Sequence, residues 1–232
     1  MSSPLSPLPA GFAATVVALH RVAELVVAPA RKPDNEIALT PTPGGFGTPE
    51  FEYDGARRQV RVEGTELVQA VGDGQRRAPL TSLAEAGTVV AELLPADADL
   101  SDDPLALDAD AAAVLADWYE FGGAVLRAFA ATAPAGDAAT EPILWPEHFD
   151  LAIELGDEAA GERATYGFSP GDENHAEPYA YVAPWRSGVE GELWNAVGFG
   201  GAELGYEELL GAADPQATAT DFFAARRRAL AA

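Results

Sequence analysis

The stretch that decides the fold class spans residues 141–186 and reads EPILWPEHFDLAIELGDEAAGERATYGFSPGDENHAEPYAYVAPWR. Apolar and polar residues alternate with a period of two in several short runs, and turn residues separate these runs. This pattern is typical of antiparallel strands, and we expect three of them here. The same stretch holds two of the three histidines and two of the four tryptophans of the chain. It therefore also predicts where a functional site would lie.

Similar alternation occurs earlier in the chain, between residues 36 and 71, with turn residues at Gly44-Gly45, Asp54-Gly55 and Asp73-Gly74. Helical periodicity is predicted for residues 12–28 and 81–94, and for a long central helix near 108–132. Because the strands come in runs and do not alternate with helices, we expect an α+β fold. Antiparallel sheet would be covered by helices.

The length of 232 residues suits one large domain. We expect a flexible arm over residues 1–10 and a single α+β domain over 11–232, with possible sub-halves 11–133 and 141–232. The acidic, proline-broken segment 95–110 lacks the aspartate spacing and central glycine of an EF-hand loop. It therefore predicts a solvated linker.

Two helices carry patterns that predict specific packing. An apolar stripe on the long helix predicts a core position and consists of Val114, Trp118, Phe121, Val125 and Phe129. Ser82 or Thr81, followed by Glu85, forms a capping-box pattern at the start of the shorter helix.

Two further residues carry local predictions. His20 lies at the edge of the apolar face of the first helix, and we expect it to be a structural residue paired with Glu24. Near the C-terminus, we expect Asp214-Pro215 to break the chain before a terminal helix that starts at Thr220.

Composition excludes several classes of function. The chain carries 37 acidic and 14 basic residues, a formal net charge of -23. A field of this sign repels phosphate backbones and anionic lipids, so we expect neither a nucleic acid nor a membrane as partner. The absence of cysteine excludes disulfides and thiolate metal sites. We find no signal-peptide pattern and no uninterrupted apolar window of membrane-spanning length, and we expect a soluble, cytoplasmic protein.

The strand starting at His148 is expected to have two different faces. Alternation places Phe149, Leu151, Ile153 and Leu155 on a core face, and His148, Asp150, Ala152 and Glu154 on the opposite face. Three aromatic residues share one face of a later strand and form either core or the floor of an apolar pocket. The candidate ligand-binding residues are His148, Asp150, Glu154, His175, Tyr179, Tyr181, Trp185 and Arg186.

A metal-dependent alternative rests on the order of four residues. His148, Asp150, His175 and Arg186 imitate the His-x-Asp…His…Arg order of iron(II)/2-oxoglutarate oxygenases. In that reading, His148, Asp150 and His175 would hold iron or another divalent metal. The spacing between the histidines is shorter than the barrel of that family normally allows. Without a metal, His148 could act as a general base oriented by Asp150 or Glu154.

Three blocks of the second half resemble a family of uncharacterised bacterial proteins: LWPEHFDLAIELG, YGFSPGDENHAEPYAYVAPW and LWNAVGFGG. The resemblance covers roughly residues 141–200 and implies no activity. It implies that the recurring pattern of the family includes Trp145, Glu147, His148, Asp150, Ser169, Gly171, Asp172 and His175.

These observations leave two classes of function open. One is a small-molecule-binding protein with a pocket near His148, Asp150 and His175, with the metal-dependent enzyme as its alternative. The other is a structural domain with a solvated polar strand face, whose aromatic residues form core or a self-association surface. The sequence does not decide the ligand, the enzymatic status or the oligomeric state.

Overall fold

The computed structural model describes residues 5–34, 36–172 and 174–232, and the chain divides into two compact units. Unit 1 comprises Met1–Pro7, Trp118–Ile143 and Asp150–Ala232; unit 2 comprises Leu8–Asp117 and Leu144–Phe149. The division falls inside the long helix and inside the stretch 141–186, and so differs from the sub-halves expected from the sequence. Residues 1–4 of the expected flexible arm lie outside the described residues.

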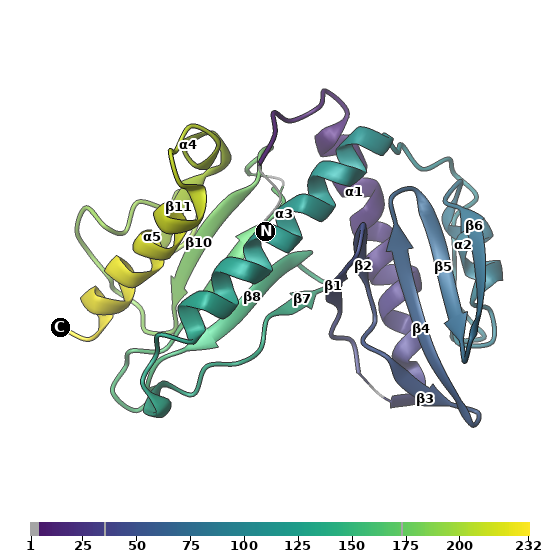
Figure 1. Ribbon diagram of the computed structural model, residues 1–232, viewed down its shortest axis with the longest axis horizontal. Coiled ribbons are helices and arrows are strands. Elements are labelled where there is room, and N and C mark those ends of the chain that lie inside the picture. Colours follow the sequence, from purple (N-terminus) through teal and green to yellow (C-terminus); the bar gives the residue numbers. More distant parts are fainter. Residues whose placement is uncertain (1–4, 35, 173) are drawn as a thin grey trace. The chain divides into compact units, whose positions relative to one another are not determined.

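Unit 2 contains an antiparallel sheet with the strand order β1-β2-β4-β5-β6, in which β3 also pairs with β4 (Figure 1). Its elements are α1 (Phe12–Val22), a π-helical turn (Ala23–Val27), a 3-10 segment (Ala28–Asp34), β1 (Thr40–Thr42), β2 (Gly45–Gly47), β3 (Phe51–Tyr53), β4 (Ala56–Glu63), β5 (Glu66–Val71), β6 (Gly74–Pro79) and α2 (Leu83–Val89).

Unit 1 contains the second antiparallel sheet, with the order β11-β10-β9-β8-β7 (Figure 1). Its elements, with α3 and β7 crossing the division between units, are α3 (Ala109–Ala130), a 3-10 turn (Ala135–Asp137), β7 (Ile143–Trp145), β8 (Asp150–Leu155), β9 (Ala164–Ser169), β10 (Tyr179–Pro184), β11 (Ala202–Gly205), α4 (Tyr206–Leu210) and α5 (Pro215–Leu230). The fold class is α+β with antiparallel sheets, as predicted. The long helix is present as α3.

One face of the unit 1 sheet packs against α3 and α5. Trp118 of α3 lies edge-on to Phe168 of β9 with ring centroids 5.1 Å apart, and Phe223 of α5 contacts the same ring at 5.6 Å. A Cβ atom at Gly122 would lie 2.8 Å from Phe168, so glycine permits this close approach of helix and strand. The predicted apolar stripe of α3 is buried throughout, which confirms it as core.

The turn and cap predictions are confirmed in part. Asp54 and Gly55 have φ angles of 51° and 72° and connect β3 to β4, as their sequence predicts. Ser82 Oγ accepts a hydrogen bond of 3.1 Å from the Glu85 amide and caps α2. Asp214-Pro215 does not precede the last helix as a separate turn, because α5 begins at Pro215 and not at the predicted Thr220. Asp214 caps α5 through the amide of residue 217 at 3.0 Å, and Pro215 occupies its first turn, where a missing N–H costs nothing.

His20 is a structural residue with partners other than the predicted one. Its Nε2 lies 2.8 Å from the carbonyl oxygen of Pro146, and its ring stacks on Phe149 at 5.2 Å. No pairing with Glu24 is found among the described residues. The histidine therefore connects α1 to the segment 144–149 inside unit 2.

The helical run Phe12–Arg31 is long and apolar enough to cross a membrane by length and composition alone, which the sequence reading did not anticipate. Arg21 and Glu24 interrupt the apolar run, but the mean hydropathy of the helix is still 1.5. Within the protein, 56% of this window is buried. A buried core helix and a signal sequence near the N-terminus meet the same criteria.

Candidate functional site

Strand β8 begins at Asp150 and not at His148, which corrects the predicted polar face. Phe149 has a φ angle of 54°, and its amide donates a 2.7 Å hydrogen bond to the carbonyl of Trp145. This turn interrupts the alternation just before the strand. Leu151, Ile153 and Leu155 are buried as expected. His148 is exposed and belongs to unit 2, whereas Asp150 belongs to unit 1.

Unit 1 has a second sheet face, opposite the helices, which we call the tyrosine face. The strand register places Tyr181 beside Gly167, and Tyr179 beside Ser169. Gly167 in turn pairs with Ala152, and Glu203 of β11 pairs with Tyr181. The tyrosine face comprises Asp150, Ala152, Glu154, Thr165, Gly167, Ser169, Tyr179, Tyr181 and Glu203.

Asp150 is a buried carboxylate on this face, with 6% of its surface exposed. The hydroxyl of Tyr181 donates a short hydrogen bond to Asp150 Oδ2. Burial, and then the negative charge of Asp150, raise the pKa of Tyr181 well above its ordinary value, and the same two causes act on Tyr119. Both phenols therefore remain protonated, and Tyr181 serves as a donor that connects β10 to β8.

A second polar cluster lies in the loop between β9 and β10. Asp172 Oδ1 accepts hydrogen bonds from the amides of Asn174 at 2.7 Å and His175 at 2.9 Å. Its Oδ2 accepts one from the Tyr179 hydroxyl at 2.7 Å. The imidazole of His175 lies between two carboxylates, 3.5 Å from Asp172 Oδ1 and 3.1 Å from Glu203 Oε2. The loop is thereby attached to both β10 and β11.

These contacts predict an acid-sensitive loop. Burial alone would raise the pKa of Asp172, but the hydrogen bonds from Tyr179 and from the amides of Asn174 and His175 outweigh burial and lower it. A lowered pKa means that Asp172 stabilises the folded state above its unfolded pKa, and that this contribution is lost as the pH falls through the folded pKa. We expect Tyr179→Phe to move the titration midpoint of Asp172 upward, as measured by carboxyl NMR at low protein concentration. An unchanged midpoint would contradict the assigned role of this hydrogen bond.

The loop, β10, β11 and α4 together line an open pocket of about 470 Å³ in unit 1. Its lining residues are His175, Ala176, Glu177, Pro178, Tyr179, Asn195, Glu203, Gly205, Tyr206 and Glu208. The amide of Asn195 donates to the Glu203 carbonyl and accepts from the Glu203 amide, both at 3.1 Å. Asn195 thus imitates a neighbouring strand along the edge of β11 and holds this pocket wall in place.

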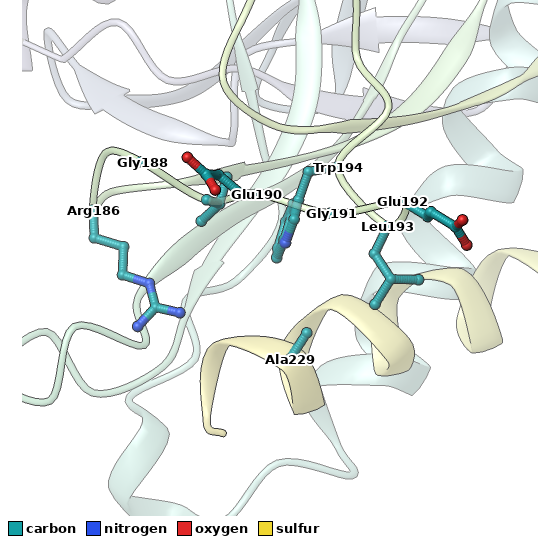
Figure 2. A pocket seen from close by; sticks show the side chains of 9 residues that line it. Arg186, Gly188, Glu190, Gly191, Glu192, Leu193, Trp194 and Ala229 are labelled. Atoms are coloured by element: carbon teal, nitrogen blue, oxygen red, sulfur yellow. The ribbon is translucent and has the colours of Figure 1, made fainter.

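Arg186 lines a different pocket of unit 1, with a volume of about 390 Å³. Figure 2 shows the loop of residues 186–194 facing Ala229 of α5, with Leu193 pointing toward that helix. Arg226 of α5 donates a 3.2 Å hydrogen bond to the carbonyl of Leu193 and so attaches the loop. Arg186 and His175, both candidate ligand-binding residues from the sequence, therefore line different pockets.

The two remaining predicted residues lie near Arg163. The guanidinium of Arg163 lies 2.8 Å from Glu154 Oε2 and 5.0 Å from the ring centroid of Trp185. Trp185 is 49% exposed, and its indole donates a long 3.4 Å bond to Thr165. This group is an ion pair covered by an aromatic ring, which is an ordinary surface arrangement.

Only part of the predicted set is therefore brought together. His175 and Tyr179 line one pocket, and Asp150 and Tyr181 form a hydrogen-bonded pair on the tyrosine face. Sequence reasoning missed Asn195, Glu203 and Glu208, because β11 lies inside a glycine-rich segment that does not alternate clearly. Among the described residues, no group of three or more histidines or carboxylates is arranged to hold a metal ion. The expected metal ligands His148, Asp150 and His175 thus gain no support.

No family model, curated protein or solved structure matches this chain. The resemblance of residues 141–200 to a family of uncharacterised bacterial proteins stays a prediction. Function has to be argued from the geometry and chemistry of the pocket alone.

Proposed function

We propose that unit 1 binds a small organic molecule in the pocket between the β9–β10 loop, β10, β11 and α4. The observation that carries this proposal is the pocket itself, whose volume of about 470 Å³ falls within the range of ligand sites. The aromatic ring of Tyr179 and a few polar groups border it, and such groups fix the orientation of ligands in small-molecule sites.

The polar groups of the pocket are held in place by hydrogen bonds outside it. Asp172 accepts hydrogen bonds from the His175 amide and from the Tyr179 hydroxyl, and so fixes both residues. The side-chain amide of Asn195 fixes the backbone of Glu203. A wall that is ordered before binding reduces the entropy lost when a ligand arrives. This preorganisation favours a binding site over a solvated strand face.

The alternative of a divalent-metal enzyme that uses His148, Asp150 and His175 finds no further support. Asp150 and His175 each have other partners, Tyr181 for the first and the carboxylates of Asp172 and Glu203 for the second. The pocket is also compatible with catalysis on a bound molecule, but its residues assign no reaction.

Filling the pocket is expected to weaken ligand binding at least about tenfold. In Ala176→Trp, the indole would occupy space that a ligand needs, while the free energy of unfolding should change by less than about 0.5 kcal/mol, because Ala176 is exposed. The measurement is a fragment screen followed by amide chemical shifts of the full chain. We expect hits that perturb His175, Tyr179 and Glu203 in the wild type and lose affinity at least about tenfold in the variant.

Ala229→Trp provides the matched control, because it introduces the same side chain into the 390 Å³ pocket of Figure 2. It should leave those fragment affinities unchanged. The proposal would be overturned if no fragment perturbed the pocket residues, or if Ala176→Trp and Ala229→Trp reduced binding equally.

A further inference from the structure

We infer that the ligand of this pocket is an organic cation, namely an amine attached to an apolar or aromatic body. The inference rests on the proposed small-molecule site and names the chemical class that the site would accept. It is carried by three observations: the pocket wall has more carboxylates than basic groups, its one histidine already contacts two carboxylates, and the aromatic ring of Tyr179 lies beside them.

The wall carries three carboxylates, on Glu177, Glu203 and Glu208, and none of its described residues is a lysine or an arginine. Glutamate side chains ordinarily carry a negative charge at neutral pH. The only basic side chain of the lining is His175. Its ring nitrogens already lie between Glu203 and Asp172, at 3.1 Å and 3.5 Å.

The carboxylates keep capacity for a further donor. Among the described residues, Glu208 Oε2 accepts one long bond of 3.4 Å from the Gly205 amide. Glu203 Oε2 is buried, lies 3.1 Å from His175 Nε2 and makes no hydrogen bond to a described residue. A carboxylate has about four lone-pair directions, so one contact leaves room for an ammonium. An incoming amine could donate to Glu203 and Glu208, which both line the pocket. An incoming carboxylate or phosphate would meet the same groups without a compensating cation.

Aromatic side chains beside these carboxylates suit the body of such a ligand. The ring of Tyr179 lies 4.7 Å from that of His175, and its hydroxyl is held by Asp172. The ring is thus fixed in the wall, and a cation near an aromatic face is attracted by the ring quadrupole. Tyr206 also borders the pocket, but it is 1% exposed and its ring packs against Trp118, so the ring of Tyr179 is the aromatic surface that the wall offers to a ligand. Carboxylates next to the fixed ring of Tyr179 suit an aryl-alkyl amine and disfavour a nucleotide, whose phosphates would meet carboxylates without a compensating cation.

The test compares three probes of similar size that differ in charge: 2-phenylethylamine, 2-phenylethanol and 3-phenylpropionate. Amide chemical shifts of the full chain are followed up to about 10 mM, a range that covers millimolar binding. We expect the amine to perturb the pocket residues and to bind at least about tenfold more tightly than the alcohol, since hydrogen bonds to charged groups are the stronger ones. The carboxylate should not bind.

Glu208→Gln and Glu203→Gln keep the shape of the wall and remove one charge each. Each should weaken amine binding about tenfold and leave the alcohol unchanged. Glu190→Gln, in the 390 Å³ pocket of Figure 2, is the matched control and should change neither. Glu208→Gln keeps the test valid if Glu203→Gln disturbs the loop through His175.

The inference is overturned if the amine fails to bind, if the alcohol or the carboxylate binds as tightly, or if Glu208→Gln leaves the affinity for the amine intact. These outcomes differ from a failure of the proposed function. A fragment screen that yields only neutral or anionic ligands in this pocket would retain the site and reject the cation. A screen without any ligand in the pocket would reject both.

Discussion

Replacing Gly167 with alanine is expected to lower the free energy of unfolding by about 3 kcal/mol, the largest effect of any single methyl group added to the tyrosine face. A Cβ atom at this position would lie 2.5 Å from Cε1 and 2.7 Å from the hydroxyl oxygen of Tyr181. The tyrosine ring would have to leave the strand surface. Its hydrogen bond to the buried Asp150 would be lost with it.

The reason for this sensitivity is that β9 lies between the two strands that the hydrogen bond connects. Tyr181 of β10 reaches Asp150 of β8 by crossing over Gly167 of β9, and any side chain at position 167 blocks the crossing. The effect should therefore depend on the tyrosine. In a Tyr181→Ala background the added methyl group has space, and Gly167→Ala should then cost less than about 1 kcal/mol.

Urea denaturation of the four proteins in this double-mutant cycle measures the coupling. Gly74→Ala is the matched control, since a Cβ atom there would meet only the Val71 carbonyl at 3.5 Å, an ordinary contact. It should change the free energy of unfolding by less than about 1 kcal/mol. If Gly167→Ala lowers the free energy of unfolding equally with and without Tyr181, the tyrosine ring does not pack against Gly167.

The fold class was predictable because it depends on local patterns. The alternation in β4, β8 and β10 and the period of the α3 stripe each reflect one buried face, and a buried face is encoded by neighbouring residues. The ends of elements were less predictable. Pro215 reads as a helix breaker in isolation, but after the capping carboxylate of Asp214 it begins α5.

The site was predictable only at the level of individual residues. His175 and Tyr179 stood out as polar and aromatic residues in the decisive stretch, and both line the pocket. Glu203, which contacts His175, lies on β11, and that contact depends on strand order, which no local pattern encodes. His148 was misplaced for a local reason, since the positive φ of Phe149, the next residue, interrupts the alternation between His148 and the start of β8 at Asp150.

The second large effect is expected in the helix-covered core of unit 1. There, Trp118→Ala should lower the free energy of unfolding by roughly 3–5 kcal/mol, the range typical of a buried tryptophan. Trp118 is fully buried, lies edge-on to Phe168 at 5.1 Å and to Tyr206 at 5.3 Å, and donates an indole hydrogen bond of 2.9 Å to the carbonyl of Ser169. Truncation leaves a cavity and a buried carbonyl without its donor.

Trp185→Ala is the matched control, because the same side chain is removed from a position that is 49% exposed. Its loss removes the contact with Arg163 and should cost about 1 kcal/mol or less. Trp118 also lies between the sheet and Tyr206, a residue of the pocket wall, so its truncation should weaken ligand binding as well as stability. Urea denaturation measures the free energy of unfolding of both variants. If Trp118→Ala and Trp185→Ala lose the same amount, α3 does not anchor this sheet, and the pocket would need another source of rigidity.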